Sequence, residues 1–173
     1  FVPVKANFEL ERLAWMLTGI FYTLLIGFRF EVGGDWFGYL GRYEGAGDLS
    51  LIEAINSTDP GYVLLNWLAF RIGGGVFLVN LVCGAITIYG LIQFAKRQPL
   101  PWLAMVVAVP YIIIVVTMGY TRQATALGFV FLALVAFSDQ RLSKFVLLLV
   151  VAALFHKSAI LLLPLGILAN SKN

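Results

Sequence analysis

Five side chains that could do chemistry stand where apolar segments of this sequence meet polar loops. They are Arg29, Asp35, Arg122, His156 and Lys157. Arginine suits phosphate because its planar guanidinium group donates paired, charge-assisted hydrogen bonds, and a carboxylate or an imidazole can take the proton of a hydroxyl group. These residue types indicate a site that binds an anionic headgroup, such as a diphosphate, and activates a hydroxyl.

Each of these residues also has a structural interpretation. Arg29 and Arg122 could anchor helix ends at a membrane interface, and Asp35 could be a turn or helix-cap residue. His156 is the only histidine, and a lone histidine is more often a satisfied structural group than a base and cannot form a zinc site by itself. The single cysteine, Cys83, excludes a disulfide framework and a cysteine-ligated metal, so we expect no metal and no cofactor.

The composition indicates the class of protein that carries these residues. Of 173 residues, 61% are hydrophobic and only 12% are charged, whereas soluble domains are nearer half apolar and a quarter charged. The net charge of +3 includes no basic run longer than Lys96-Arg97. These values exclude an ordinary cytosolic domain, a disordered tail and a nucleic-acid-binding protein, and they predict an integral membrane protein.

The uncharged stretches predict an all-α, polytopic fold with about six membrane segments, in which residues 1–173 form a single transmembrane domain. The stretches are Leu13–Phe28, Ile72–Ala95, Gln98–Thr121, Gln123–Ser138, Phe145–Phe155 and Ser158–Ser171. A spanning helix needs about 20 apolar residues, so the shorter stretches must borrow flanking residues. The last two are either two short spans that meet at 156–158 or one long helix. Because a lysine at mid-bilayer costs about 3 kcal/mol, we favour two spans.

The basic residues predict the orientation of these segments. With a cytoplasmic N-terminus, seven of the twelve Lys and Arg residues fall inside and five fall outside. Six of the nine acidic residues then lie in an extracytoplasmic loop, residues 29–71. In this orientation the five candidate residues share the outer side of the membrane, where a lipid headgroup also lies.

The 29–71 loop reads as an ordered segment. Gly33-Gly34 and residues 45–47 mark turns, and residues 49–55 predict a short amphipathic helix. Asp59 is suited to cap a helix that begins at Pro60, and the apolar stretch 62–72 is too short to span, which indicates a re-entrant or interfacial half-helix. The aromatic side chains of the loop are expected to form a belt at headgroup depth. They are Trp36, Tyr39, Tyr43, Tyr62 and Trp67.

Four segments, in order along the chain, resemble motifs of the EpsG/Wzy-like bacterial exopolysaccharide (O-antigen) polymerase family. Residues 28–39 match R-x-x-x-G-x-D-x-x-x-Y at Arg29, Gly33, Asp35 and Tyr39. D-P-G-Y-V-L-L-N at 59–66 is similar to E-P-x-Y-x-x-L-N, with aspartate where glutamate is usual. T-R-Q-A-T-A-L-G at 121–128 resembles R-Q-x-(I/L)-A, and F-H-K-S-A-I-L-L-L-P at 155–164 resembles F-H-x-(S/T)-A-L-x-x-x-P. Because members of the family are longer, we expect this chain to be an N-terminal portion.

The resemblance implies an enzyme of the bacterial cytoplasmic (inner) membrane that polymerises polysaccharide repeat units on the extracytoplasmic side without a nucleotide sugar. Its donor is a glycan on undecaprenyl diphosphate, and its acceptor is a hydroxyl of another lipid-linked unit. Further expected partners are membrane lipids, a chain-length regulator and a flippase, with no nucleic acid.

The resemblance also suggests how the site divides its work. Substrate binding falls to the cations and two polar neighbours, namely Arg29, Arg122, Lys157, Gln123 and Tyr39. The catalytic candidates are Asp35 and His156, either of which could be the general base. We favour Asp35 because it follows Arg29 across a Gly-Gly turn, whereas the positive charge of Lys157 favours a phosphate-binding role for His156.

Other functions stay open at this point. A lipid-linked sugar flippase or other transporter would need the same cations without a base. A membrane acyltransferase acting on surface polysaccharide would use a histidine and an arginine. A structural subunit of an assembly complex would need neither.

Overall fold

The computed structural model describes residues 8–170, with side chains described through Gly166, and within that range it is helical. Three helices are long and apolar enough to cross a membrane, namely α1 (Phe8–Gly27), α5 (Gly75–Ala95) and α7 (Thr121–Ser138). Shorter apolar helices follow the same course, namely α6 (Pro101–Ala108) with η1 (Val109–Thr117), α8 (Leu142–Phe155), and η2 (Lys157–Leu162) with α9 (Leu163–Asn170). The predicted all-α membrane fold is therefore confirmed in its helices and their composition.

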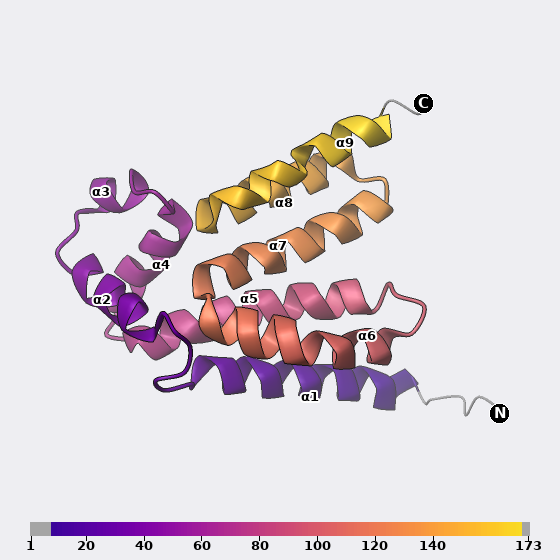
Figure 1. Cartoon of the computed structure of the whole chain (residues 1–173), viewed down its shortest axis with the longest axis horizontal. Coiled ribbons are helices and arrows are strands. Elements are labelled where there is room, and N and C mark those ends of the chain that lie inside the picture. The colour runs from indigo at the N-terminus through magenta and orange to yellow at the C-terminus, as the bar shows by residue number, and fades with distance from the viewer. Residues whose placement is uncertain (1–7, 171–173) are drawn as a thin grey trace.

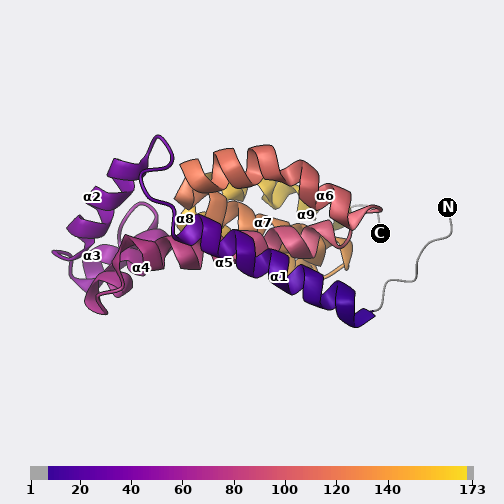
Figure 2. The same cartoon turned by 90° about the horizontal axis from the view of Figure 1, so that it is seen from below.

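These helices lie side by side and run in alternating directions, as Figure 1 shows. α5 packs between α1 and α7, and α8 packs on the other side of α7. The segment 29–71 forms three further helices, α2 (Trp36–Ala46), α3 (Leu51–Ile55) and α4 (Pro60–Arg71). Figures 1 and 2 both place α2–α4 together beyond one end of the bundle. We call this the loop end, and the other the opposite end.

Glycines allow the central helices to approach closely. A Cβ atom on Gly90 of α5 would lie 2.1 Å from the carbonyl oxygen of Gly128 in α7. A Cβ atom on Gly128 would lie 2.7 Å from the carbonyl oxygen of Ile86. Small residues at such crossings let apolar helices pack by backbone contact. This contact fixes the start of α7, and therefore Arg122, relative to α5.

The third apolar segment changes its hydrogen-bond pattern partway along. Pro110 has no backbone N–H and cannot continue an α-helical ladder, and the segment Val109–Thr117 is a π-helix. Its last hydroxyl, on Thr117, donates to the carbonyl oxygen of Ile112, five residues earlier, at 2.6 Å. The carbonyl group of Thr117 is one of the helix-end acceptors without a partner inside the helix, so it is free to accept from elsewhere.

Two sequence predictions for the ends of the apolar segments hold. His156 leaves the helical conformation, with φ −157° and ψ 116°, and α8 and η2 pack against each other on either side of it. The predicted break at His156 between two short apolar segments is thus present, and the prediction that each segment spans the membrane stays a prediction. α4 begins at Pro60 and α3 covers Leu51–Ile55, as the loop pattern predicts.

Other features of the loop differ from what the sequence pattern predicts. The pattern does not predict α2, because its interior contains three glycines, which are poor helix formers. Asp59 makes no side-chain cap bond to α4. The expected aromatic belt fails for Trp36, Tyr39 and Tyr62, each 4% exposed or less, because they pack inward against other helices.

Candidate functional site

Arg29 connects four segments at the loop end. It follows α1 and is 5% exposed. Its Nη1 donates to the carbonyl oxygen of Thr117 at 2.7 Å. Its Nη2 donates to Thr121 Oγ1 at 2.6 Å and to Asn80 Oδ1 at 3.3 Å. Burial lowers the pKa of Arg29 from its ordinary value, so the charge is held by this network at a cost in solvation.

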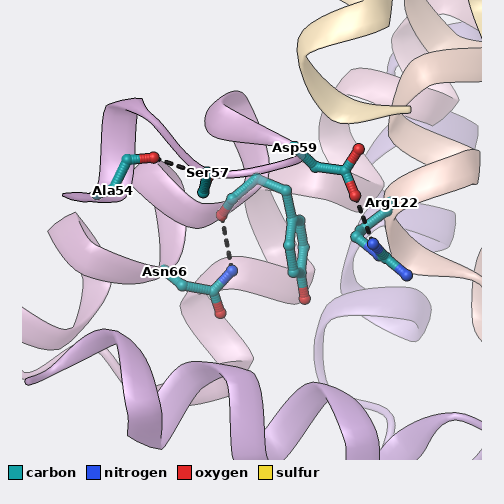
Figure 3. Close-up of polar contacts among 6 residues, drawn as sticks. Ala54, Ser57, Asp59, Asn66 and Arg122 are labelled. Atoms are coloured by element: carbon teal, nitrogen blue, oxygen red, sulfur yellow. Dashed lines mark hydrogen bonds and ion pairs between the residues drawn. The ribbon is translucent and has the colours of Figure 1, made fainter. Parts of the chain in front are cut away.

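Arg122, in the first turn of α7, forms an ion pair with Asp59, the residue before α4 (Figure 3). The exposed fractions of the two side chains are 26% and 8%. Because Arg29 holds Thr121, the two arginines are anchored at adjacent points of the structure. The pair ties the loop helices to the bundle and leaves Arg122 partly open to ligands.

Asp59 belongs to this site, although its sequence position predicts a helix cap. Its carboxylate turns toward Arg122 in Figure 3. Its position in the D-P-G-Y segment, one of the four motifs that resemble the family, is the sequence signal that could have identified Asp59 as a site residue.

The loop end also collects buried polar atoms that lack a hydrogen-bond partner. Within the described residues they are Arg29 Nε, Tyr62 Oη, Asn66 Oδ1, Asn80 Nδ2 and Arg122 Nε. Burial raises the pKa of Tyr62, so its hydroxyl stays protonated and remains a potential donor. An unmade buried hydrogen bond costs about 1–3 kcal/mol, so this concentration indicates a place where water or a polar ligand completes the structure.

Hydrogen bonds of Asn66 in α4 and of Ser57 before it hold the backbone around Asp59 and Tyr62. The Asn66 Nδ2 donates to the carbonyl oxygen of Tyr62 at 2.7 Å, which leaves its Oδ1 free. Ser57 donates to the carbonyl oxygen of Ala54 at 2.8 Å and closes the turn before Asp59 (Figure 3). The carboxylate of Asp59 is therefore presented by a turn with its own hydrogen bond.

His156 and Gln123 share a pocket of about 170 Å³ with Ser158 and apolar side chains. His156 is half-buried and Gln123 is exposed. Gln123 directly follows Arg122 in α7, but neither Arg122 nor Asp59 lines this pocket. Lys157 is exposed at the first position of η2. Between residues 8 and 170, His, Cys, Asp and Glu side chains form no group of three that could hold a metal ion.

Asp35 and Tyr39 are placed differently from each other. Asp35 is exposed at the start of α2, and its side chain makes no cap bond. No hydrogen bond or ion pair in the described part of the chain joins it to Arg29 or Arg122. Tyr39 is buried and packs edge-on against Tyr62, with 5.7 Å between ring centroids.

Gly33 seats the segment between Arg29 and Asp35 on the bundle. It has a φ of +98°, and a Cβ atom there would lie 2.4 Å from the carbonyl oxygen of Met118. Only glycine combines this conformation with so close an approach. The predicted turn at Gly33-Gly34 is therefore confirmed, and it is fixed against the connection between η1 and α7.

Comparison with known proteins gives one match. The model of the EpsG family matches residues 12–173, nearly the whole chain. The comparisons with curated proteins and with solved structures give no match. The matched range includes every residue of the site described above.

Proposed function

This chain belongs to the EpsG family of Wzy-like polymerases, and we propose that it polymerises polysaccharide repeat units by glycosyl transfer from an undecaprenyl-diphosphate-linked donor. The family indicates a polysaccharide polymerase role in exopolysaccharide biosynthesis and a membrane protein. The donor, and reaction at the outer face of the bacterial cytoplasmic membrane, are the parts that we propose here.

The ion pair of Arg122 and Asp59 at the loop end is the observation that carries the proposal. A lipid diphosphate presents its charge where the hydrocarbon ends, which is the level at which an apolar helix ends. Arg122 lies in the first turn of α7, where the helix dipole also favours an anion. Its guanidinium already binds one carboxylate, so the position is suited to an oxyanion.

In the proposed reaction a hydroxyl oxygen of the acceptor attacks the anomeric carbon of the donor. The bond between that carbon and the diphosphate oxygen breaks, and the lipid diphosphate leaves with the electron pair. A general base takes the hydroxyl proton. Arg122 stabilises the charge that develops on the leaving group, with Lys157 as a second cation on the exposed side.

In this proposal Arg29 does not contact the substrate and acts through Arg122. The sequence motif predicts that Arg29 binds substrate, but its two terminal nitrogens already donate to protein acceptors. We therefore propose that Arg29 mainly positions Thr121 and, through it, Arg122. Direct binding of the diphosphate by Arg29 would require these bonds to break.

His156 is our preferred base for the reaction. It lines a pocket together with Gln123, the residue after Arg122, whereas Asp35 is exposed and makes no hydrogen bond or ion pair with either arginine in the described structure. This geometry favours His156 over Asp35, the opposite of the preference drawn from the sequence. Asp35 stays the alternative.

The test is chain growth in proteoliposomes that contain the protein and a lipid-diphosphate-linked repeat unit. The proposal predicts glycans of several repeat units, resolved by mass spectrometry. Translocation of the lipid without new glycosidic bonds would instead identify a transporter. His156→Ala should abolish growth while Asp35→Asn keeps it; the reverse result would make Asp35 the base.

The outward orientation of the loop end needs a separate test. Gly45 is exposed, and a Cβ atom there meets nothing within 4 Å, so Gly45→Cys should fold normally. We expect a membrane-impermeant thiol reagent to label it from outside the cell. Lys144→Cys, near the start of α8 at the opposite end, should be labelled only from inside. The opposite pattern would invert the topology.

A further inference from the structure

A groove runs between α1 and α5 on the outside of the bundle, well away from the candidate site. It has a volume of about 560 Å³. Its walls are mostly apolar, with two cationic side chains at one end. The lining residues on which the argument depends are Arg12, Trp15, Gly19, Leu24, Ala85 and Lys96.

Small side chains create the hollow. Gly19 and Ala85 face the groove from α1 and α5. A Cβ atom on Gly19 would already lie 3.3 Å from Ile92 Cδ1, so a larger residue there would narrow the space. The groove is therefore a product of residue size at specific positions on the two helices.

The cations lie together at one end of the groove. The Lys96 Nζ lies 5.2 Å from the centroid of the Trp15 ring. Arg12 lies less than one helical turn before Trp15 and lines both this groove and an adjoining recess of about 300 Å³, to which Glu11 and Lys96 also contribute. Arg12 lies near the start of α1 and Lys96 directly follows α5, so both cations lie at the opposite end of the bundle.

The length of the groove corresponds to one leaflet of a bilayer. From Arg12 to Leu24 along α1, a rise of 1.5 Å per residue gives about 18 Å. Half of the hydrocarbon thickness of a bilayer is about 15 Å. An acyl chain that starts at the cations would thus lie along apolar side chains until about the middle of the membrane.

We propose that this groove binds an acyl chain of an anionic phospholipid whose phosphate is held by Arg12 and Lys96. The arrangement favours a lipid because one molecule supplies both an anion for the two cations at the groove's mouth and an acyl chain for the apolar walls behind them. Lys and Arg near a membrane surface each attract anionic lipid by about 1 kcal/mol. The proposal is independent of the proposed polymerase activity.

Lipid binding tests the proposal directly. The protein is reconstituted in vesicles of equal phosphatidylglycerol and phosphatidylcholine, extracted in mild detergent, and analysed by native mass spectrometry. We expect retained phosphatidylglycerol to exceed phosphatidylcholine by about tenfold. The double variant Arg12→Gln with Lys96→Gln should lose this preference, and Lys144→Gln, a cation removed elsewhere at the opposite end, should keep it.

A second variant separates the acyl chain from the headgroup. Ala85→Phe fills the groove from an exposed position on α5 and leaves both cations in place, so it should reduce retention of both lipids while circular dichroism shows the same helix content. Equal retention of the two lipids by the unaltered protein would overturn the proposal. So would an unchanged preference in the double variant, or a dimer that Ala85→Phe dissociates, because the groove would then hold a second copy.

Discussion

Each end of the bundle has an arginine–aspartate pair, and the two pairs differ in their surroundings. At the opposite end, Arg97 donates to both carboxylate oxygens of Asp139, at 2.7 and 3.1 Å. Those side chains are 52% and 26% exposed, against 26% and 8% for Arg122 and Asp59 at the loop end. Exposed pairs contribute about 0–1 kcal/mol, whereas losing one partner of a buried pair costs about 3–5 kcal/mol.

The comparison shows that the charged groups with the larger desolvation cost lie at the loop end. Arg97 and Asp139 have a favourable bidentate geometry, and this pair is the more exposed of the two, with Arg97 exposed and Asp139 half-buried. The loop end buries Arg29 and Asp59 and leaves several polar atoms without partners. Stability alone would not favour this arrangement, since apolar residues of similar volume are often as stable as a buried ion pair. We propose that ligand binding accounts for it.

Removing Arg29 should have the largest effect on the loop end. Arg29→Ala leaves Asn80 Oδ1 and the Thr117 carbonyl oxygen without their hydrogen-bond donor, and it opens a cavity where the side chain was. We therefore expect a loss of about 3 kcal/mol or more in the free energy of unfolding. Chemical unfolding in detergent measures this. Arg97→Ala is the matched control and should cost less than about 1 kcal/mol. Equal losses would remove the distinction between the ends.

Breaking each ion pair from its acidic side should give the next largest difference. Asp59→Ala leaves Arg122 partly buried without its carboxylate and should cost about 3 kcal/mol. Asp139→Ala should cost less than about 1 kcal/mol. The comparison is made on the same unfolding curves, and a greater loss for Asp139→Ala would contradict it.

The turn that seats the loop should respond to a single methyl group. Gly33→Ala forces a Cβ atom against Met118 at a φ of +98°, so we expect a loss of about 1–3 kcal/mol. Gly34→Ala adds its methyl group to open space and should be nearly neutral. Thermal unfolding of the two variants separates them, and equal midpoints would show that the loop is not fixed at Gly33.

The smallest expected effect lies in α3 and depends on pH. Hydrogen bonds from the backbone and side chain of Ser50 lower the pKa of Glu53. A lowered pKa means that the added stability is present above the ordinary pKa of about 4.3 and is lost as pH falls through the lowered value. The protection factors of the α3 amides, which are observed exchange rates corrected for the intrinsic pH dependence, should therefore fall below about pH 4. Ser50→Ala should remove most of this dependence, and an unchanged profile would contradict the capping box.

The fold followed from apolar segment lengths more closely than the site did. Two short segments around His156 could be predicted because a mid-bilayer lysine is costly. The helix α2 could not, because its three glycines argue against a helix and contacts with α4 and α5 decide the outcome. Tertiary packing of this kind overrides local propensity.

For the site, the sequence placed the right residues at one end without their partners. Arg29 and Arg122 were expected at the same level, and the structure joins them through Thr121. That Arg29 is buried, and that Asp59 turns to Arg122 instead of capping α4, depends on contacts between residues far apart in the chain. A local motif carries no information about such contacts.

The central claim is that Arg122 at the loop end binds the leaving diphosphate, and a pair of conservative substitutions tests it most directly. Arg122→Lys and Arg97→Lys keep both charges but replace the planar fork with an ammonium group. Polymer growth from a lipid-diphosphate-linked repeat unit is measured for both variants in the same proteoliposomes. We predict that Arg122→Lys lowers the rate about a hundredfold and that Arg97→Lys leaves it unchanged. An Arg122→Lys protein that polymerises at the unaltered rate would contradict the account.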